Sequence, residues 1–317
     1  MNPDSMPGLA FLRLSGFHTF TIITMKVIQK FKAGAWLVMV LAVLSSCSKT
    51  EEVKVLGNEP PPDHTIDSAT LQLYVYKAYI NLTGREPLGN EKGEALAILR
   101  QDNFSHNNRK QFLDQLFLKS DYNRNLYNVA RAEYLQNTDS AEVAQQMVLF
   151  NLLLTQPQYA PVYDLIRYEL KRLDTLQNTL RDLQNGVADY REMLRRCVNN
   201  YFYDQINMGT ENFVISTFQN FLFRYPGTTE LNQGKLMVDG QNAQLFLELG
   251  KNKNDYLRIF FNSDNYFEGQ VRYVFRKFMF REPSSAEIYF YADIYKSSMN
   301  YRDLLKAVLS TNEYAGV

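Results

Sequence analysis

A block built around Arg-x-Pro occurs three times in this chain and constrains the fold more than any other feature. Each copy has an arginine two residues before the proline and a glutamate four residues after it. Each also keeps a valine twelve residues before the proline, an aromatic residue eight before, and Leu or Phe five before. The chain is therefore predicted to contain a repeated structural unit. The three corners are Arg85, Pro87 and Glu91; Arg224, Pro226 and Glu230; and Arg281, Pro283 and Glu287.

The block is typical of one helix that stops and another that starts. The positions twelve, nine, eight and five before the proline share one helical face, which predicts one apolar stripe per copy. The proline disfavours α conformation in the residue before it and is expected to end the helix there. That places the arginine in the last turn and the glutamate in the first turn of the next helix, where each charge suits the helix dipole. Ser284 and Glu287 also have the spacing of a capping box. An Arg–Glu ion pair across each corner fits a structural role, and a repeated anion pocket is the functional alternative.

A second segment follows each corner. It is a short amphipathic helix that ends in a polar turn and a tyrosine, and a fourth example stands in the middle of the chain. The block expected before that fourth example, near Leu152–Pro157, lacks the arginine, so its unit is predicted to be degenerate or absent. The four segments are Gln111–Tyr122, Asp189–Tyr203, Asp255–Tyr266 and Asn300–Tyr314.

The predicted fold class is all-α, with repeated units of helix, Arg-x-Pro corner, helix and helix, plus a long central helical hairpin. Ala141–Leu154 is predicted to be a buried helix, and Val162–Asn185 a single long helix ended by Gly186. Near-heptad leucines in the second helix permit pairing with a partner helix or packing on its own neighbours. The predicted segments are 1–24 (unstructured, before the true start), 25–46 (signal peptide), 47–67 (tether), 68–135 (first unit), 136–210 (central segment), 211–268 (repeat unit) and 269–317 (last unit).

The N-terminal region predicts the compartment. From Met25 a basic segment leads into the apolar run 33–44 and then Leu-Ser-Ser-Cys, which is typical of a secretory signal. The ending resembles the lipobox of bacterial lipoproteins, in which the cysteine, here Cys47, carries the lipid. A plain signal peptide or an N-terminal membrane anchor is the alternative. Ser48 follows the cysteine, so outer-membrane sorting is expected, with the chain at the periplasmic face or the cell surface.

Composition excludes several classes of function. The chain has 34 basic and 34 acidic residues, and four of the basic ones precede Cys47. No basic face for nucleic acid is therefore expected. His64 and His106 are isolated, and no phosphate loop, metal-ligand spacing or nucleophile elbow is present. We expect no cofactor, no metal, no catalytic residues and no enzymatic activity. Cys197 is expected to pack in the core.

The corners and closing segments together resemble the helical repeat of phycobilisome-linker-like domains, which also occurs as a domain of unknown function in bacterial extracellular proteins. The likeness covers about residues 71–122 and 214–314. The first unit is also similar to an uncharacterised domain found beside cytochrome-type modules in planctomycete-like proteins. Gly84 fits the family's turn, whereas Phe223 and Phe280 depart from it. The resemblance implies a small helical interaction domain and brings no catalytic residues with it.

Three functions stay open on the sequence. The leading hypothesis is a lipid-anchored envelope protein that acts as a non-enzymatic interaction or scaffold module for another envelope protein. The second is a surface lipoprotein that binds glycan or peptidoglycan through exposed Tyr and Phe. The third is a carboxylate-dependent hydrolase or an accessory subunit of an envelope redox assembly. Exposed aromatic residues in a groove would favour the second hypothesis, and two converging acids in a cleft would favour the third.

Overall fold

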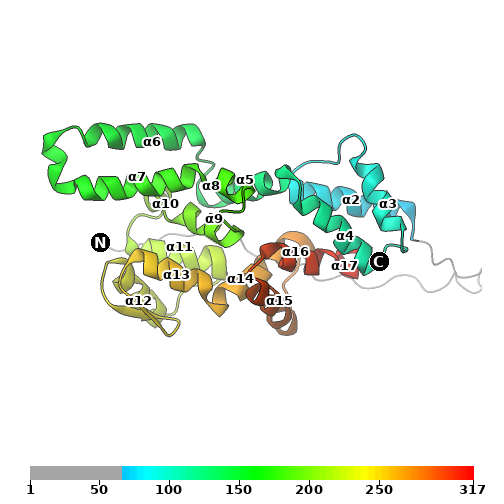
Figure 1. Cartoon of the computed structure of the whole chain (residues 1–317). Helices are drawn as coiled ribbons and strands as arrows, with labels where there is room; N and C mark the ends of the chain where they lie inside the picture. Colours follow the sequence, from blue (N-terminus) through cyan, green and yellow to red (C-terminus); the bar gives the residue numbers. More distant parts are fainter. Residues whose placement is uncertain (1–65) are drawn as a thin grey trace, which may run out of the picture. The chain divides into compact units, whose positions relative to one another are not determined.

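The structure is a computed structural model that describes residues 66–317, which belong to one compact unit (Figure 1). Helices make up 74% of this part of the chain, so the all-α prediction is confirmed. One short antiparallel hairpin, β1 (Ala243–Leu245) with β2 (Glu248–Gly250), is the exception, and it pairs Gln244 with Leu249. The predicted segments 1–24 and 25–46 and Cys47 lie outside the described residues.

The first unit contains α2 (Ser68–Thr83), α3 (Glu91–Arg100) and α4 (His106–Phe117), and α5 (Ser120–Tyr134) follows it. Every residue of the predicted apolar stripe of α2 is buried, because α3, α4 and α5 all pack against that helix. Ser105 caps α4 by accepting a hydrogen bond from the Asn108 N–H at 3.3 Å. The stripe residues are Val75, Ala78, Tyr79 and Leu82.

The central segment contains α6 (Ser140–Leu153), the 3₁₀ turn η1 (Pro157–Val162), α7 (Tyr163–Gln177), α8 (Thr179–Gln184), α9 (Tyr190–Val198) and α10 (Tyr201–Ile206). The predicted hairpin is present, but the single long helix over Val162–Asn185 was wrong: it divides at Asn178. The buried Thr179 hydroxyl bonds back to the Thr175 carbonyl at 2.9 Å, a contact that bends helices. Leu173, Leu176 and Leu183 are buried within this chain, so they do not form a free partner face.

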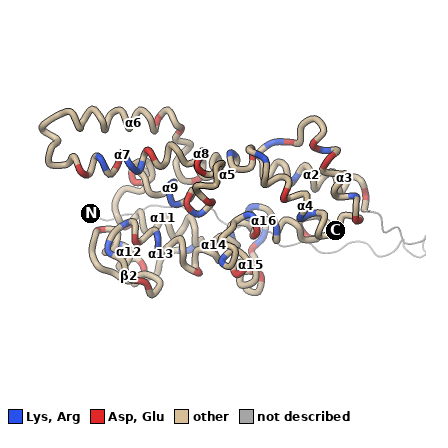
Figure 2. Tube along the Cα trace, viewed as in Figure 1, with Lys and Arg blue, Asp and Glu red and all other residues tan. Residues whose placement is uncertain are grey.

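The prediction that Ala141–Leu154 is a buried helix was also wrong. The helix forms as α6, yet Val143 is its one fully buried residue. Its main neighbour is α7, and the end of the hairpin that the two form extends beyond the other helices (Figure 1). Beyond Glu142 in its first turn α6 has no charged residue, as Figure 2 shows. Apolar composition therefore identified the helix but not its surroundings.

The second half of the chain contains α11 (Thr210–Leu222), α12 (Thr228–Val238), the β-hairpin, α13 (Lys253–Asn262) and α14 (Asp264–Val274). A turn of π-helix, η2 (Phe275–Met279), extends α14 and leads to α15 (Ser285–Ser298), α16 (Tyr301–Leu309) and α17 (Asn312–Ala315). The stripes of α11 and of α14 with η2 are buried as predicted. The predicted boundary between residues 268 and 269 falls inside α14, which ends one unit and begins the next. The stripe residues are Val214, Thr217, Phe218, Phe221, Val271, Val274, Phe275 and Phe278.

The first and last units lie side by side, in contact through residues such as Tyr74 and Leu309 that are 235 positions apart in sequence (Figure 1). The Tyr74 hydroxyl on α2 donates to the Leu309 carbonyl at 3.0 Å, and Lys77 donates to the Tyr314 carbonyl at 3.2 Å. Asn81 donates to the Tyr314 hydroxyl at 2.9 Å. The closing tyrosine of the last unit thus packs against the first helix of the chain, which joins the repeated units into one body.

Candidate functional site

The three Arg-x-Pro corners have the same hydrogen bonds. In each, both terminal nitrogens of the arginine contact the two carboxylate oxygens of the glutamate six residues later, which is the expected ion pair in its two-pronged form. One oxygen of the same glutamate also accepts the backbone N–H three residues before it, as in a capping box. The nitrogen–oxygen distances are 2.7 and 3.0 Å for Arg85–Glu91, 2.7 and 2.7 Å for Arg224–Glu230, and 3.0 and 2.6 Å for Arg281–Glu287.

The aromatic residue of the stripe lies under each guanidinium group. The guanidinium carbon is 5.8 Å from the ring centre at Tyr79, 5.0 Å at Phe218 and 4.9 Å at Phe275. Each of these rings stands six residues before its arginine. A cation over a ring face gains electrostatic attraction, so the aromatic residue and the arginine of the block form one cluster.

A third partner of each arginine was missed from the sequence. It is the residue just before the closing tyrosine: Asp121 at 2.8 Å from Arg85, Asn265 at 3.2 Å from Arg224, and Glu313 at 2.5 Å from Arg281. Aligning the closing segments on their tyrosines would have revealed a side-chain oxygen at this position. The fourth segment has Phe202 there, which agrees with the lack of an arginine in its unit.

These contacts favour the structural role of the corners over an anion pocket. Arg281 makes five hydrogen bonds, and Arg85 makes four, so few N–H groups are left for an external anion. Hydrogen bonds from the arginines lower the pKa of Glu91 and of Glu287 to about 2. Each glutamate is therefore firmly ionised and held between two helices.

The chain turns each corner through a residue in the left-handed region, which corrects two details of the prediction. The helices end four residues before the proline, and the arginine follows the helix and does not belong to its last turn. The reversing residues are Gly84 (φ 71°), Phe223 (φ 55°) and Phe280 (φ 56°). This conformation costs a residue with a Cβ about 1–2 kcal/mol. Phe223 and Phe280 thus adopt the same backbone conformation as Gly84, at a cost in strain that glycine does not have.

Replacing Phe280 by glycine is expected to raise the free energy of unfolding by about 0.5–1 kcal/mol, because it removes this strain at a slightly larger unfolded-state entropy. Phe280 is 82% exposed, so little packing is lost. Urea unfolding followed by circular dichroism measures the change. Phe280→Ala keeps the Cβ and the strain, and no gain is expected from it. A loss of stability in the glycine variant would show that the phenyl ring itself stabilises the corner.

The connection between α5 and α6 resembles a corner without the arginine. Asp139 and Glu142 form a capping box there, with the Asp139 N–H donating to Glu142 at 2.7 Å. Arg131 reaches the carbonyls of Asn137 and Thr138 instead of a carboxylate. In chain order α5 follows α4 as α14 follows α13, so this connection resembles a corner in its position as well as in its capping box.

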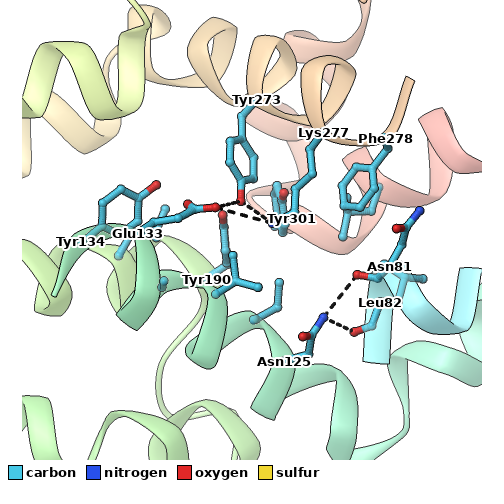
Figure 3. A pocket seen from close by; sticks show the side chains of 15 residues that line it. Asn81, Leu82, Asn125, Glu133, Tyr134, Tyr190, Tyr273, Lys277, Phe278 and Tyr301 are labelled. Atoms are coloured by element: carbon cyan, nitrogen blue, oxygen red, sulfur yellow. Dashed lines mark hydrogen bonds and ion pairs between the residues drawn. The ribbon is translucent and has the colours of Figure 1, made fainter. Parts of the chain in front are cut away.

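A small cavity lies between α5, α9, η2 and α16, lined by Glu133, Tyr273 and Lys277 (Figure 3). The Tyr273 hydroxyl donates to Glu133 at 2.9 Å and accepts from the Lys277 ammonium at 2.6 Å. Burial lowers the pKa of Lys277, and burial raises the pKa of Tyr273. An amine of lowered pKa is a candidate base or nucleophile.

The size of this cavity decides its role. Its volume is about 20 Å³. A single water needs at least about 10–15 Å³, whereas pockets for small molecules are typically about 300 Å³ or larger. The Glu133–Tyr273–Lys277 cluster therefore links α5 to α14 and η2 and leaves no room for a substrate.

A larger groove of about 550 Å³ lies between α9 and α13. Two acids line it, but both have structural partners: Asp189 accepts the Glu192 N–H at 2.6 Å and caps α9, and Glu192 is paired with Arg195 and Arg196. Burial alone would raise the pKa of Glu192, but hydrogen bonds from the two arginines outweigh it and the pKa is lowered. Neither acid is placed as a proton donor. Polar side chains from both helices dominate the groove, among them Arg191, Arg258, Asn254 and Asn262.

The remaining candidates are structural. Nδ1 of His106 lies 2.9 Å from the Ser310 carbonyl and joins the first unit to the last. His64 lies outside the described residues. Cys197 is fully buried in α9, as expected, and burial raises the pKa of its thiol to about 12.

This burial makes the Cys197 thiol inert in the folded protein. The thiolate is the reactive form, so we expect the native chain to react with a disulfide reagent at least about a hundred times more slowly than the unfolded chain. Release of the coloured thiol product with and without urea measures the two rates. Comparable rates in both states would contradict the packing described here.

Among residues 66–317 no cluster of His, Cys, Asp and Glu could hold a metal ion. A search of the same residues finds no helix long and apolar enough to cross a membrane. No protein-family model, no curated protein and no solved structure matches this chain.

Proposed function

We propose that the chain is a lipid-anchored envelope protein that acts as a non-enzymatic interaction or scaffold module. The observation that supports this proposal is that the repeated corner residues, Arg and Glu, form hydrogen bonds with other groups of the same chain. Arg281 makes five hydrogen bonds, all to this chain's own carboxylates and one carbonyl, so the arginine of this corner holds the two helices together. The central cavity, with room for about one water, supports the same conclusion.

The anchor is proposed from the Leu-Ser-Ser-Cys sequence ending at Cys47. A lipid at this position holds the helical unit at a membrane surface and needs no membrane-spanning helix to do so. Metabolic labelling with a radioactive fatty acid in a bacterial host tests it. The natural chain is expected to take up label, and Cys47→Ala is expected to lose it. Label retained by Cys47→Ala would place the lipid elsewhere and overturn the anchor.

The scaffold role is tested by crosslinking in intact envelopes. The expected result is a reproducible protein partner that crosslinks to the natural chain. A variant with Arg224→Met and Glu230→Leu, which opens one corner, is expected to lose that crosslink while remaining anchored. Recovery of no protein partner, together with binding to isolated peptidoglycan, would overturn the scaffold role.

The groove between α9 and α13 favours glycan binding as the second candidate. Its amide and guanidinium groups suit sugar hydroxyls, and an adjoining groove of about 200 Å³ brings in the partly exposed ring of Tyr168. Sugar binding would combine hydrogen bonds with stacking on this ring. Loss of peptidoglycan binding in a Tyr168→Ala, Arg191→Ala variant would support this candidate. The acids of the groove are engaged with Arg195, Arg196 and the start of α9, so the hydrolase alternative gains no support.

A further inference from the structure

The α6–α7 hairpin has an exposed apolar end that nothing in the described chain covers. We call this surface the hairpin tip, defined by the exposed residues Val148, Leu149, Leu152, Tyr159, Val162 and Leu165. Val148 is 67% exposed and Leu165 59%. Lone exposed leucines are common on soluble proteins, but several large apolar residues exposed along one hairpin usually mark an interaction surface.

The hairpin is anchored at its base and has few neighbours at its end. Ile166, Leu173 and Leu176 on α7 are buried, and α7 packs on α9 and α10. Phe150 on α6 meets the ring of Tyr201 with the centres 5.3 Å apart. The exposed residues of α6 lie on the other side of that helix. The tip is therefore not needed to complete the core of the described unit.

Charge is absent from the stretch that holds every residue of the tip except Leu165. Residues 143–163 contain no Asp, Glu, Lys, Arg or His, and the charges resume at Glu142 and Asp164 (Figure 2). The stretch contains leucines, a phenylalanine, two prolines and two tyrosines, and its polar residues are mainly Asn and Gln. Interfaces with proteins usually have a polar rim and favour arginine. A bilayer surface excludes charges from its apolar layer and accepts tyrosine at the headgroup level.

We propose that the hairpin tip inserts into the headgroup and outer acyl region of a lipid bilayer as a second, non-covalent membrane contact. The inference rests on the proposed lipid anchor, which holds the unit at a membrane. Residues 48–65 separate Cys47 from the first described residue, and such a segment spans at most about 60 Å. The tip is thus kept at a high local concentration near the bilayer. Insertion fixes how the helical unit faces the membrane, which the tether alone does not.

The test uses the lipidated, full mature protein in vesicles of phosphatidylcholine. A single fluorophore is attached to Leu152→Cys, since the buried Cys197 does not react, and the vesicles contain brominated phosphatidylcholine as a quencher. The matched control is the same fluorophore at Leu118→Cys, the residue just after α4, where the wild-type leucine is 77% exposed. We expect quenching at position 152 and none at position 118. Because residues 143–163 have no charge, and the neighbouring Asp164 is paired with Arg167 at 2.9 Å, neither high salt nor anionic lipid should change the result.

A second pair of variants tests the contribution of the apolar side chains. Val148→Ser with Leu149→Ser, in the protein labelled at position 152, is expected to lower the ratio of inserted to free hairpin by about tenfold or more. The control Leu73→Ser removes a side chain that is 68% exposed on α2 and should leave the ratio unchanged. Both sites are exposed, so the fold is retained, and circular dichroism checks this.

The outcomes separate the two proposals. A protein that carries the lipid and floats with the vesicles, but whose label at position 152 is not quenched, overturns the insertion of the tip. The same holds if energy transfer shows that two copies shield the label from water, because the tip is then a contact between copies. Absence of lipid on Cys47 overturns the anchor instead.

Discussion

Replacing Gly269 by alanine is expected to destabilise the protein by about 3 kcal/mol or more, or to prevent folding. Gly269 lies in α14 where that helix crosses the end of α11. A Cβ added there would stand 1.9 Å from the Phe221 carbonyl oxygen and 3.1 Å from the Leu222 Cα. These are backbone atoms, so no side-chain rotation can relieve the clash. The two helices would have to separate, which opens the aromatic core around Phe221.

Urea unfolding followed by circular dichroism measures the loss. Gly93→Ala is the matched control, because Gly93 lies inside α3 and an added Cβ meets nothing within 4 Å. This control is expected to gain about 0.5–1 kcal/mol from improved helix propensity. If Gly269→Ala folds with wild-type stability, the close approach of α14 to α11 is not present in the protein.

The contrast between these two glycines shows how far the sequence could lead. Both stand within helical sequence patterns, and both read there as weak points. The importance of Gly269 comes from Phe221, a residue 48 positions earlier that the fold brings against it. No local pattern reveals such a crossing. The apolar stripes of the corner helices, in contrast, were predictable. The helical spacing of residues such as Val214 and Phe218 is enough to predict that they are buried.

The α6–α7 hairpin and the β1–β2 hairpin show what amino-acid composition and turn patterns could not predict. The apolar run of α6 identified a helix, but burial depends on what packs against it, and only α7 does so extensively. The β-hairpin was missed because its turn residues, Phe246 and Leu247, are not the Asn-Gly type and still adopt positive φ. The corner arginines were assigned correctly to the glutamates six residues later. Their third partners, such as Asp121, depend on the packing of the closing segment and were not found.

Acid is expected to unfold this protein through its corner glutamates. The folded-state pKa of Glu91 is about 2, lowered from 4.5 by the hydrogen bonds of Arg85. A lowered folded-state pKa stabilises the fold fully above the unfolded value and loses this contribution as the pH falls from about 4.5 to about 2. The Glu91 side chain is 18% exposed and contributes up to about 3 kcal/mol. Glu287 contributes less, because its partner Arg281 is 36% exposed and solvent screens the pair.

The free energy of unfolding, measured with urea from pH 2 to pH 7, is therefore expected to fall steeply below about pH 4.5. Glu91→Gln combined with Glu287→Gln should lower stability at pH 7 by several kcal/mol and flatten this dependence, because a neutral amide cannot pair with Arg85 or Arg281 at any pH. Glu94→Gln is the control: this residue forms no ion pair within residues 66–317, and its variant should follow the natural chain. An unchanged acid transition in the double variant would assign the transition to other carboxylates. The Arg–Glu ion pairs of the corners would then contribute little to stability, and the packing of the aromatic rings under the arginines would hold the corners together.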